Sequence, residues 1–276
     1  MNRLVIVLLP ALLAAGCSVP RSGTLGTAPT GSAAASAPPA AETSPTGTVT
    51  VQLWFVRAGK LVPTHRTRPA TVATSRLVLA ELAAGPSPAE AAAGLSSAVP
   101  SGAGFGIASI ADGVETVSFD PGFSAGDTGT VRLRRAQVVY SLTQFPTVSR
   151  VQFRSGAEPL GRPAARSEYA DLLPPIVVTS PDIGERLSGP VTVDGTADVF
   201  EATVNVRVLD AAGRVIATAF TTATCGTGCR GDYRVAVAYR LADDQPGTVE
   251  VYEVSPRDGS RVNVVAVPVI LAATGR

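Results

Sequence analysis

Two regions of the chain have a regular spacing of hydrophobic and polar residues. In the first, residues 48–160, segments that alternate with period two, as β-strands do, are interrupted by two segments with the period of about 3.6 residues that is typical of a helix. The expected strands cover residues 48–57, 60–62, 106–111, 114–119 and 148–153, and the expected helices cover residues 74–84 and 132–145. This order predicts an α+β domain, similar in size to many single domains, in which helices cover one face of a small sheet.

Turn and cap residues indicate where these elements end. Ala58-Gly59 and Asp112-Gly113 predict tight turns between neighbouring strands. Thr74 or Ser75 can cap the first helix at its N-terminus, and Gly85-Pro86 would stop it, because proline cannot continue a helix.

The second patterned region, residues 174–276, begins at Pro174-Pro175 and alternates with period two throughout. The spacing of its strands over roughly 100 residues is typical of an immunoglobulin-like β-sandwich. About seven strands are expected, at residues 176–179, 191–195, 203–209, 214–221, 233–239, 248–254 and 262–271. Residues 161–173 are then a bridging segment between an α+β domain and an all-β sandwich.

The start of the chain resembles a bacterial lipoprotein signal. A short positive stretch precedes an apolar run at residues 4–15, which is shorter than the roughly 20 residues that a membrane span needs. The small residues before Cys17 resemble a lipobox, although Ala14 stands where leucine is usual. We expect residues 1–16 to be removed and Cys17 to carry the lipid. The alternatives are an uncleaved signal and a cleavage that leaves a free thiol.

Residues 17–47 contain Ser, Thr, Ala, Gly and Pro and almost nothing large to bury. Such a composition predicts a disordered leash, with a root-mean-square reach of about 30 Å. Two or three acyl chains on Cys17 would attach this leash stably to a bilayer. The sequence thus predicts a protein lipid-anchored to the extracytoplasmic face of the cell membrane.

The overall charge excludes some classes of partner. The formal net charge is +1, and only 16% of the residues are charged. A nucleic-acid-binding protein or a polybasic membrane patch would carry a larger field of one sign. We therefore expect no nucleic-acid partner.

Longer motifs carry a resemblance to known families. The first region contains LVLAELAAGPSP at 77–88, VP at 99–100, ADGVETVSFDPGF at 111–123 and RRAQVVYSLTQFPTVSRVQF at 134–153. On these motifs, residues 48–160 resemble a GerMN domain of spore germination and sporulation proteins. The second region contains the segment 175–210, CGTGCRGDY and VYEVSPRDGSRVNVVAVPVIL at 251–271. On these, residues 174–276 resemble the immunoglobulin-like domain that accompanies GerMN. The resemblance implies a cell-envelope lipoprotein without known catalytic residues.

Few residues are candidates for chemistry. Cys225 and Cys229 bracket a Gly-Thr-Gly loop, and a zinc site would need further ligands that a chain with one histidine hardly supplies. A short disulfide is expected outside the cytoplasm, with a redox dithiol or two idle thiols as alternatives. His65, in PTHRTR, is expected in an exposed loop, although a general base or a metal ligand is the functional alternative.

Four other side chains are candidates for an interface. Arg132, Arg134 and Arg135 are expected to open the second helix, either as a solvated face or as a contact patch for an acidic partner or wall polymers. Trp54, the only tryptophan, is expected either under a helix or at an interface.

Together these features predict a non-enzymatic envelope protein, without cofactor or metal, that docks other envelope proteins or peptidoglycan. The alternative is a solute-binding or substrate-presenting lipoprotein with a pocket between its two domains. An enzyme that uses His65 ranks third, because no G-x-S-x-G motif accompanies it. The sequence leaves the oligomeric state open.

Overall fold

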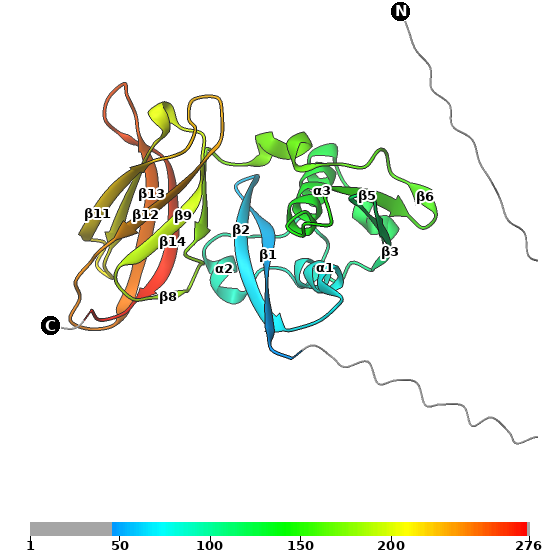
Figure 1. Cartoon of the computed structure of the whole chain (residues 1–276), viewed down its shortest axis with the longest axis horizontal. Helices are drawn as coiled ribbons and strands as arrows, with labels where there is room; N and C mark the ends of the chain where they lie inside the picture. The colour runs from blue at the N-terminus through cyan, green and yellow to red at the C-terminus, as the bar shows by residue number, and fades with distance from the viewer. Residues whose placement is uncertain (1–45, 275–276) are drawn as a thin grey trace, which may run out of the picture. The chain divides into compact units, whose positions relative to one another are not determined.

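The computed structural model describes residues 46–274 (Figure 1). The expected signal peptide, the lipid on Cys17 and nearly all of the leash therefore lie outside the described residues. Within residues 46–274, no helix is both long and apolar enough to span a bilayer.

The first folded element is a long hairpin. Strand β1 (Thr48–Arg57) pairs antiparallel with β2 (Lys60–Pro69) over ten residue pairs. The turn residues Ala58 and Gly59 both have positive φ, which matches the twist of a two-residue hairpin turn. The predicted turn is confirmed, but β2 extends far beyond the expected residues 60–62, because the polar segment after Pro63 hides the strand pattern.

Three α-helices follow or accompany the hairpin: α1 (Thr74–Ala84), α2 (Pro88–Ala92) and α3 (Thr128–Leu142). The prediction that Thr74 or Ser75 caps α1 is wrong, since Ala73 holds that position and Ser75 instead donates to a buried carboxylate. Helix α3 begins one turn earlier than expected. Its N-cap is Asp127, whose Oδ1 accepts from the backbone N–H of Thr130 at 2.9 Å.

The first domain contains two sheets, so the prediction of one small sheet with helices on one face is wrong. The hairpin β1–β2 is separate from a four-stranded sheet with the order β3-β4-β5-β6. These strands are β3 (Phe105–Ala111), β4 (Val114–Phe119), β5 (Arg150–Ser155) and β6 (Glu158–Pro159). Helix α3 contacts both β1 and β5, and α1 contacts both β1 and β3, so the helices lie between the sheets (Figure 1).

Two 3-10 helices complete this domain, η1 (Pro121–Ser124) and η2 (Arg166–Leu172). Phe119, Phe123 and Phe153 stack on one another in the core, with ring centroids 3.9 to 6.2 Å apart.

The remaining strands form a β-sandwich. One sheet has the order β11-β10-β13-β14-β8, and the other has the order β12-β9-β7. Valines dominate the core between them. The strands are β7 (Ile176–Ser180), β8 (Arg186–Leu187), β9 (Val191–Ala197), β10 (Thr203–Leu209), β11 (Val215–Thr222), β12 (Gly231–Val237), β13 (Gln245–Val254) and β14 (Arg261–Leu271), with a 3-10 turn η3 (Phe200–Ala202). The predicted fold class, an α+β domain followed by a β-sandwich, is confirmed.

Candidate functional site at the domain junction

Strand β7 belongs to both cores. Ile176 and Val178 are buried in the core of the sandwich, whereas Val177 is buried in the core of the first domain. Side chains of a strand alternate between its two faces, so one strand can serve two cores. The two domains are thus packed against each other along β7.

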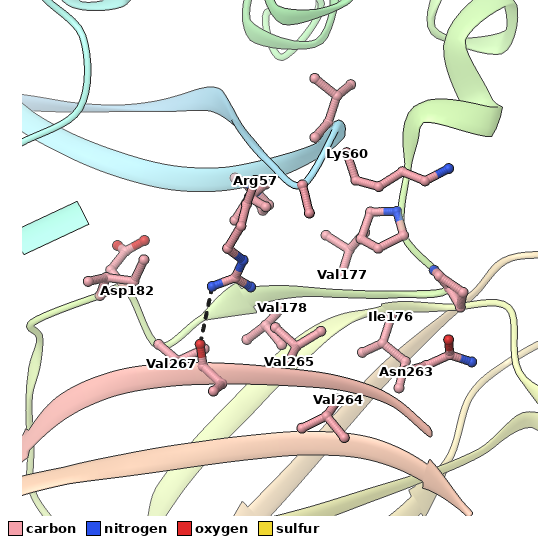
Figure 2. A pocket seen from close by; sticks show the side chains of 18 of the residues that line it. Arg57, Lys60, Ile176, Val177, Val178, Asp182, Asn263, Val264, Val265 and Val267 are labelled. Atoms are coloured by element: carbon pink, nitrogen blue, oxygen red, sulfur yellow. Dashed lines mark hydrogen bonds between the residues drawn. The ribbon is translucent and has the colours of Figure 1, made fainter. Parts of the chain in front are cut away.

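A pocket opens beside this strand, with a volume of about 210 Å³. Its lining comes from the turn end of the β1–β2 hairpin, from β7 and the segments that flank it, and from β14 (Figure 2). The apolar walls are aliphatic and proline side chains, among them Val62, Pro175, Ile176, Val178, Val265 and Val267.

Arg57, the last residue of β1, reaches across this pocket (Figure 2). Its Nη1 donates to the backbone oxygen of Ala266 on β14, at a long 3.4 Å. Burial lowers the pKa of this guanidinium, because an apolar surrounding disfavours the charged form. Within residues 46–274, no carboxylate forms a salt bridge with Arg57 within 4.0 Å.

The other charged residues of the lining have partners. Lys60 donates from Nζ to the backbone oxygen of Asp171 at 2.6 Å, and its side chain points away from Arg57 (Figure 2). Asp182 accepts from the backbone N–H of His65 at 3.1 Å, and one of its carboxylate oxygens also lies 3.1 Å from His65 Nδ1.

His65 therefore does not lie in an exposed loop, as the sequence predicted. It is a half-buried residue of β2, and its Nε2 also lies 3.4 Å from Gln52 Nε2. The hydrogen bond to Asp182 raises the pKa of His65, although burial opposes this. The sequence could not indicate this role, because Asp182 is 117 residues away along the chain.

Polar side chains of α3 hold β1 in position. Trp54 donates its backbone N–H to Ser141 Oγ at 3.0 Å, and its carbonyl accepts from Gln137 Nε2 at 2.9 Å. Two residues beyond the end of α3, Gln144 bonds both backbone groups of Gln52 at 2.8 Å. The helix and the turn after it thereby satisfy an edge of β1 that would otherwise need another strand. The i, i+4, i+7 spacing of Gln137, Ser141 and Gln144 is a signal that the apolar pattern of this segment concealed.

Two of the four interface candidates are buried, so they are not available for a partner. Trp54 is 5% exposed, and its ring lies 4.8 Å from that of Tyr140 on α3. Arg134 is 7% exposed, and it donates to the backbone oxygens of Ala98, Gly122, Phe123 and Ala125. The prediction that Arg134 lies on a solvated or contact face is wrong, because the loop before α3 folds back over it.

The two neighbouring arginines also have internal partners. Arg132 forms a salt bridge with Asp171, with Nη2 to Oδ1 at 2.6 Å. The guanidinium of Arg135 lies 5.5 Å from the ring centre of Phe153. None of the three opens the helix, since α3 starts at Thr128.

Cys225 and Cys229 form a disulfide in the loop between β11 and β12, with their Cα atoms 5.7 Å apart. The bridge closes a short loop, and neither cysteine lines the pocket. Among the described residues, no group of three His, Cys, Asp or Glu side chains is placed to hold a metal.

Two buried carboxylates lie in the first domain. Glu90 is held by Arg66, Thr64 and Ser87, and Glu115 accepts from Ser75 Oγ at 3.1 Å while its Oε1 has no hydrogen-bond partner. Burial raises the pKa of Glu115, which favours its neutral form.

Comparisons with known proteins agree with this architecture. Residues 42–161 match the family model Germane, described as sporulation and spore germination. Residues 175–260 match the model Gmad2, described as the immunoglobulin-like domain of bacterial spore germination. The comparison with curated proteins gives no match.

Three solved structures are similar at low identity. The tandem GerMN domains of the sporulation protein GerM from Bacillus subtilis are 14% identical, cover 83% of this chain and give a TM-score of 0.40; this chain covers 62% of theirs. The first GerMN domain of GerM is 20% identical over 43% of this chain and 95% of its own, with a TM-score of 0.36. A putative lipoprotein from Clostridium perfringens is 12% identical over 46% of this chain and 93% of its own, with a TM-score of 0.30.

The assignment rests on the two family models, which match consecutive parts of the chain in the order that the fold shows. Neither is a family of known enzymes. The protein consists of a GerMN domain of the sporulation and germination type followed by the immunoglobulin-like domain of bacterial spore germination.

Proposed function

We propose that this protein is a non-catalytic component of the cell envelope that docks another envelope protein along strand β11 of its sandwich. A lipid on Cys17 would hold it at the outer face of the membrane. Both matched families are described by sporulation and germination, and they support a role in the envelope rather than a reaction.

The observation that carries the proposal is the state of β11. This strand is the last in its sheet: it is hydrogen-bonded to β10 on one side and, among the described residues, to no strand on the other, although β12 of the second sheet lies near it. Its sequence, VIATAFTT, contains no charge and no proline, which are the usual means of blocking an edge strand. Phe220 is 72% exposed and Val215 is 48% exposed.

These features fit an extended segment of a partner protein. Unpaired backbone groups along an edge can bond a further strand, and an exposed side chain such as Phe220 adds specificity. A glycan of the wall offers no matching row of backbone groups, so peptidoglycan is the less favoured partner. Strand β3 is also an edge, and a register shift interrupts the pairing of each of the two strands with its neighbour. Strand β11 is favoured because its Phe220 is more exposed, at 72%, than Ile110 of β3, at 48%.

The test is site-specific photocrosslinking of the full chain in its own cells. A photoreactive residue at Thr222, which is exposed on β11, should give one protein adduct, and Phe220→Lys should abolish that adduct. Val72→Lys is the matched control, because Val72 is an 87% exposed apolar residue of the first domain. With the captured partner purified, amide hydrogen exchange at residues 215–222 should slow on binding in the unsubstituted protein but not in Phe220→Lys.

Three outcomes would contradict the proposal. An adduct of two copies of this chain would mean that β11 pairs with itself. Salt-resistant co-sedimentation with purified sacculi, without any protein adduct, would mean a wall-binding module. Unchanged exchange at residues 215–222 would place the partner elsewhere.

A second candidate function, binding of a small solute, is favoured by one specific observation, the unneutralised Arg57 in the pocket at the domain junction.

A further inference from the structure

We infer that the pocket between the β1–β2 hairpin and the sandwich binds a small organic carboxylate with a compact apolar tail. This site is separate from β11, so ligand binding there can be tested independently of the proposed docking function.

The head of the ligand is inferred from Arg57. A guanidinium offers five N–H donors, and the structure uses one of them, in a single long bond to the Ala266 carbonyl. Arg57 is half-buried, and a charge partly withdrawn from water without a charged partner is costly, so an anion that completes its hydrogen bonds is favoured at this position. The planar fork of arginine fits a carboxylate with two parallel hydrogen bonds.

The other charged side chains of the lining already have partners, so Arg57 is the one that can bind the anion. Lys60 is directed to the Asp171 carbonyl, and the carboxylate of Asp182 is directed to His65. Because one guanidinium rather than a cluster of cations faces the pocket, a singly charged carboxylate fits better than a phosphate.

The tail is inferred from the walls and the volume. Aliphatic side chains such as Val62, Val178 and Val265 present no hydrogen-bonding groups, so the part of the ligand beside them is apolar. A cavity of about 150 Å³ holds benzene, so 210 Å³ corresponds to roughly eight to ten non-hydrogen atoms. A branched or straight acid of six to eight carbons, or the carboxyl end of a peptide with an aliphatic last residue, has this size and charge.

The experiment is isothermal titration of the full-length chain carrying Cys17→Ser, which prevents lipidation. The probes are octanoate, its uncharged analogue octanamide, and acetate, which keeps the charge without the tail. Octanoate should bind at least tenfold more tightly than either, because only octanoate offers both the charge and the tail. N-acetyl-Ala-Val and its C-terminal amide form a second pair of probes, which distinguishes a free acid from a peptide end.

Variants locate the site. Arg57→Gln should weaken octanoate binding at least tenfold, and Val265→Phe should abolish it with Arg57 intact, because the larger ring fills the space. Arg240→Gln is the control, since Arg240 is an exposed arginine of the same protein that does not line the pocket. Melting curves without ligand would show that each variant folds. If Arg57→Gln does not fold, Arg57→Lys gives a second test of the role of the guanidinium.

The inference is overturned if octanamide binds as well as octanoate, if Arg57→Gln binds as the unsubstituted protein does, or if neither octanoate nor the acetylated dipeptide binds at millimolar concentration.

Discussion

His65 and Asp182 join the two domains of this protein. The ring of His65, on β2, lies with Nδ1 3.1 Å from the carboxylate of Asp182, and its backbone N–H donates to the same carboxylate at 3.1 Å. Asp182 lies just after β7, the strand that both cores share. The pair is therefore a polar contact between the domains, in addition to the hydrogen bond from Arg57 to the Ala266 carbonyl.

This pair predicts a pH dependence of stability. The hydrogen bond to Asp182 raises the pKa of His65 above 6.5, so its contribution is fully present below pH 6.5 and is lost as the pH rises through the raised value. Because the two side chains are 29% and 30% exposed, we expect a change of about 1 kcal/mol or less. Thermal unfolding between pH 5.5 and 8.5 measures it. His65→Gln should flatten this slope, and an equal slope in both proteins would contradict the assignment.

Arg134 should be far more important for stability than its neighbour Arg132. Arg134→Met removes a buried guanidinium that donates to four backbone oxygens, of which that of Gly122 keeps a second donor, the backbone N–H of Ala125. We expect a loss of about 3 kcal/mol in the free energy of unfolding. Arg132→Met, on the same helix, removes a partly exposed salt bridge and should cost less than about 1 kcal/mol. Urea denaturation of both variants tests this. Similar losses in the free energy of unfolding would mean that the hydrogen bonds of Arg134 to the loop before α3 do not stabilise the fold more than the salt bridge of Arg132 does.

Glu90 predicts a loss of stability in acid. Burial alone would raise its pKa, but hydrogen bonds from Arg66, Thr64 and Ser87 lower the pKa from 4.5 to about 2. Its contribution is therefore present above pH 4.5 and is lost as the pH falls towards 2, up to about 3 kcal/mol. Urea midpoints at pH 7, 4 and 3 measure the loss. Glu90→Gln should be less stable at pH 7 but should lose less between pH 7 and pH 3 than the unsubstituted protein.

Cys17 carries the prediction of the membrane anchor. Cys17→Ala should abolish lipid attachment and move the protein from the membrane fraction to the soluble fraction, because the acyl chains on Cys17 would supply the proposed anchor. Detergent phase partition and mass spectrometry of the N-terminal peptide measure this. A variant that stays in the detergent phase would refute the lipid anchor, whereas Cys225→Ser serves as a control that should leave partition unchanged.

The sequence predicted the parts of this fold that depend on local pattern. Strand periodicity located all the longer strands of the sandwich, and Ala58-Gly59 located the hairpin turn, because side-chain alternation and positive φ act within a few residues. It missed the features that depend on distant partners. His65 contacts the second domain only through the distant Asp182. The second edge of β1 is bonded by side chains of α3 and of Gln144 just after it, which lie 83 to 92 residues away along the chain.

The sequence analysis gave a pocket between the two domains only as an alternative, and it did not identify the residues of that pocket. Arg57 is the last residue of the alternating pattern at residues 48–57, so the sequence alone indicates a solvated residue at the end of a strand. Its significance arises from the absence of a carboxylate beside it in the described fold, together with the aliphatic walls that β7 and β14 bring near. Neither the lack of a neighbour nor the shape of a cavity has a local sequence signal.

The double attachment of β1 has a mechanical consequence. Any tension that enters the folded part of the chain through residue 46 reaches β1 first. One edge of this strand is paired with β2 along its whole length, and the other is fastened by α3 and by mutual bonds between Val56 and Ser96. A force along the strand has to rupture these bonds together rather than one after another. The hairpin would thus resist shear along β1, which suits a domain that is tethered to a membrane through its N-terminal end.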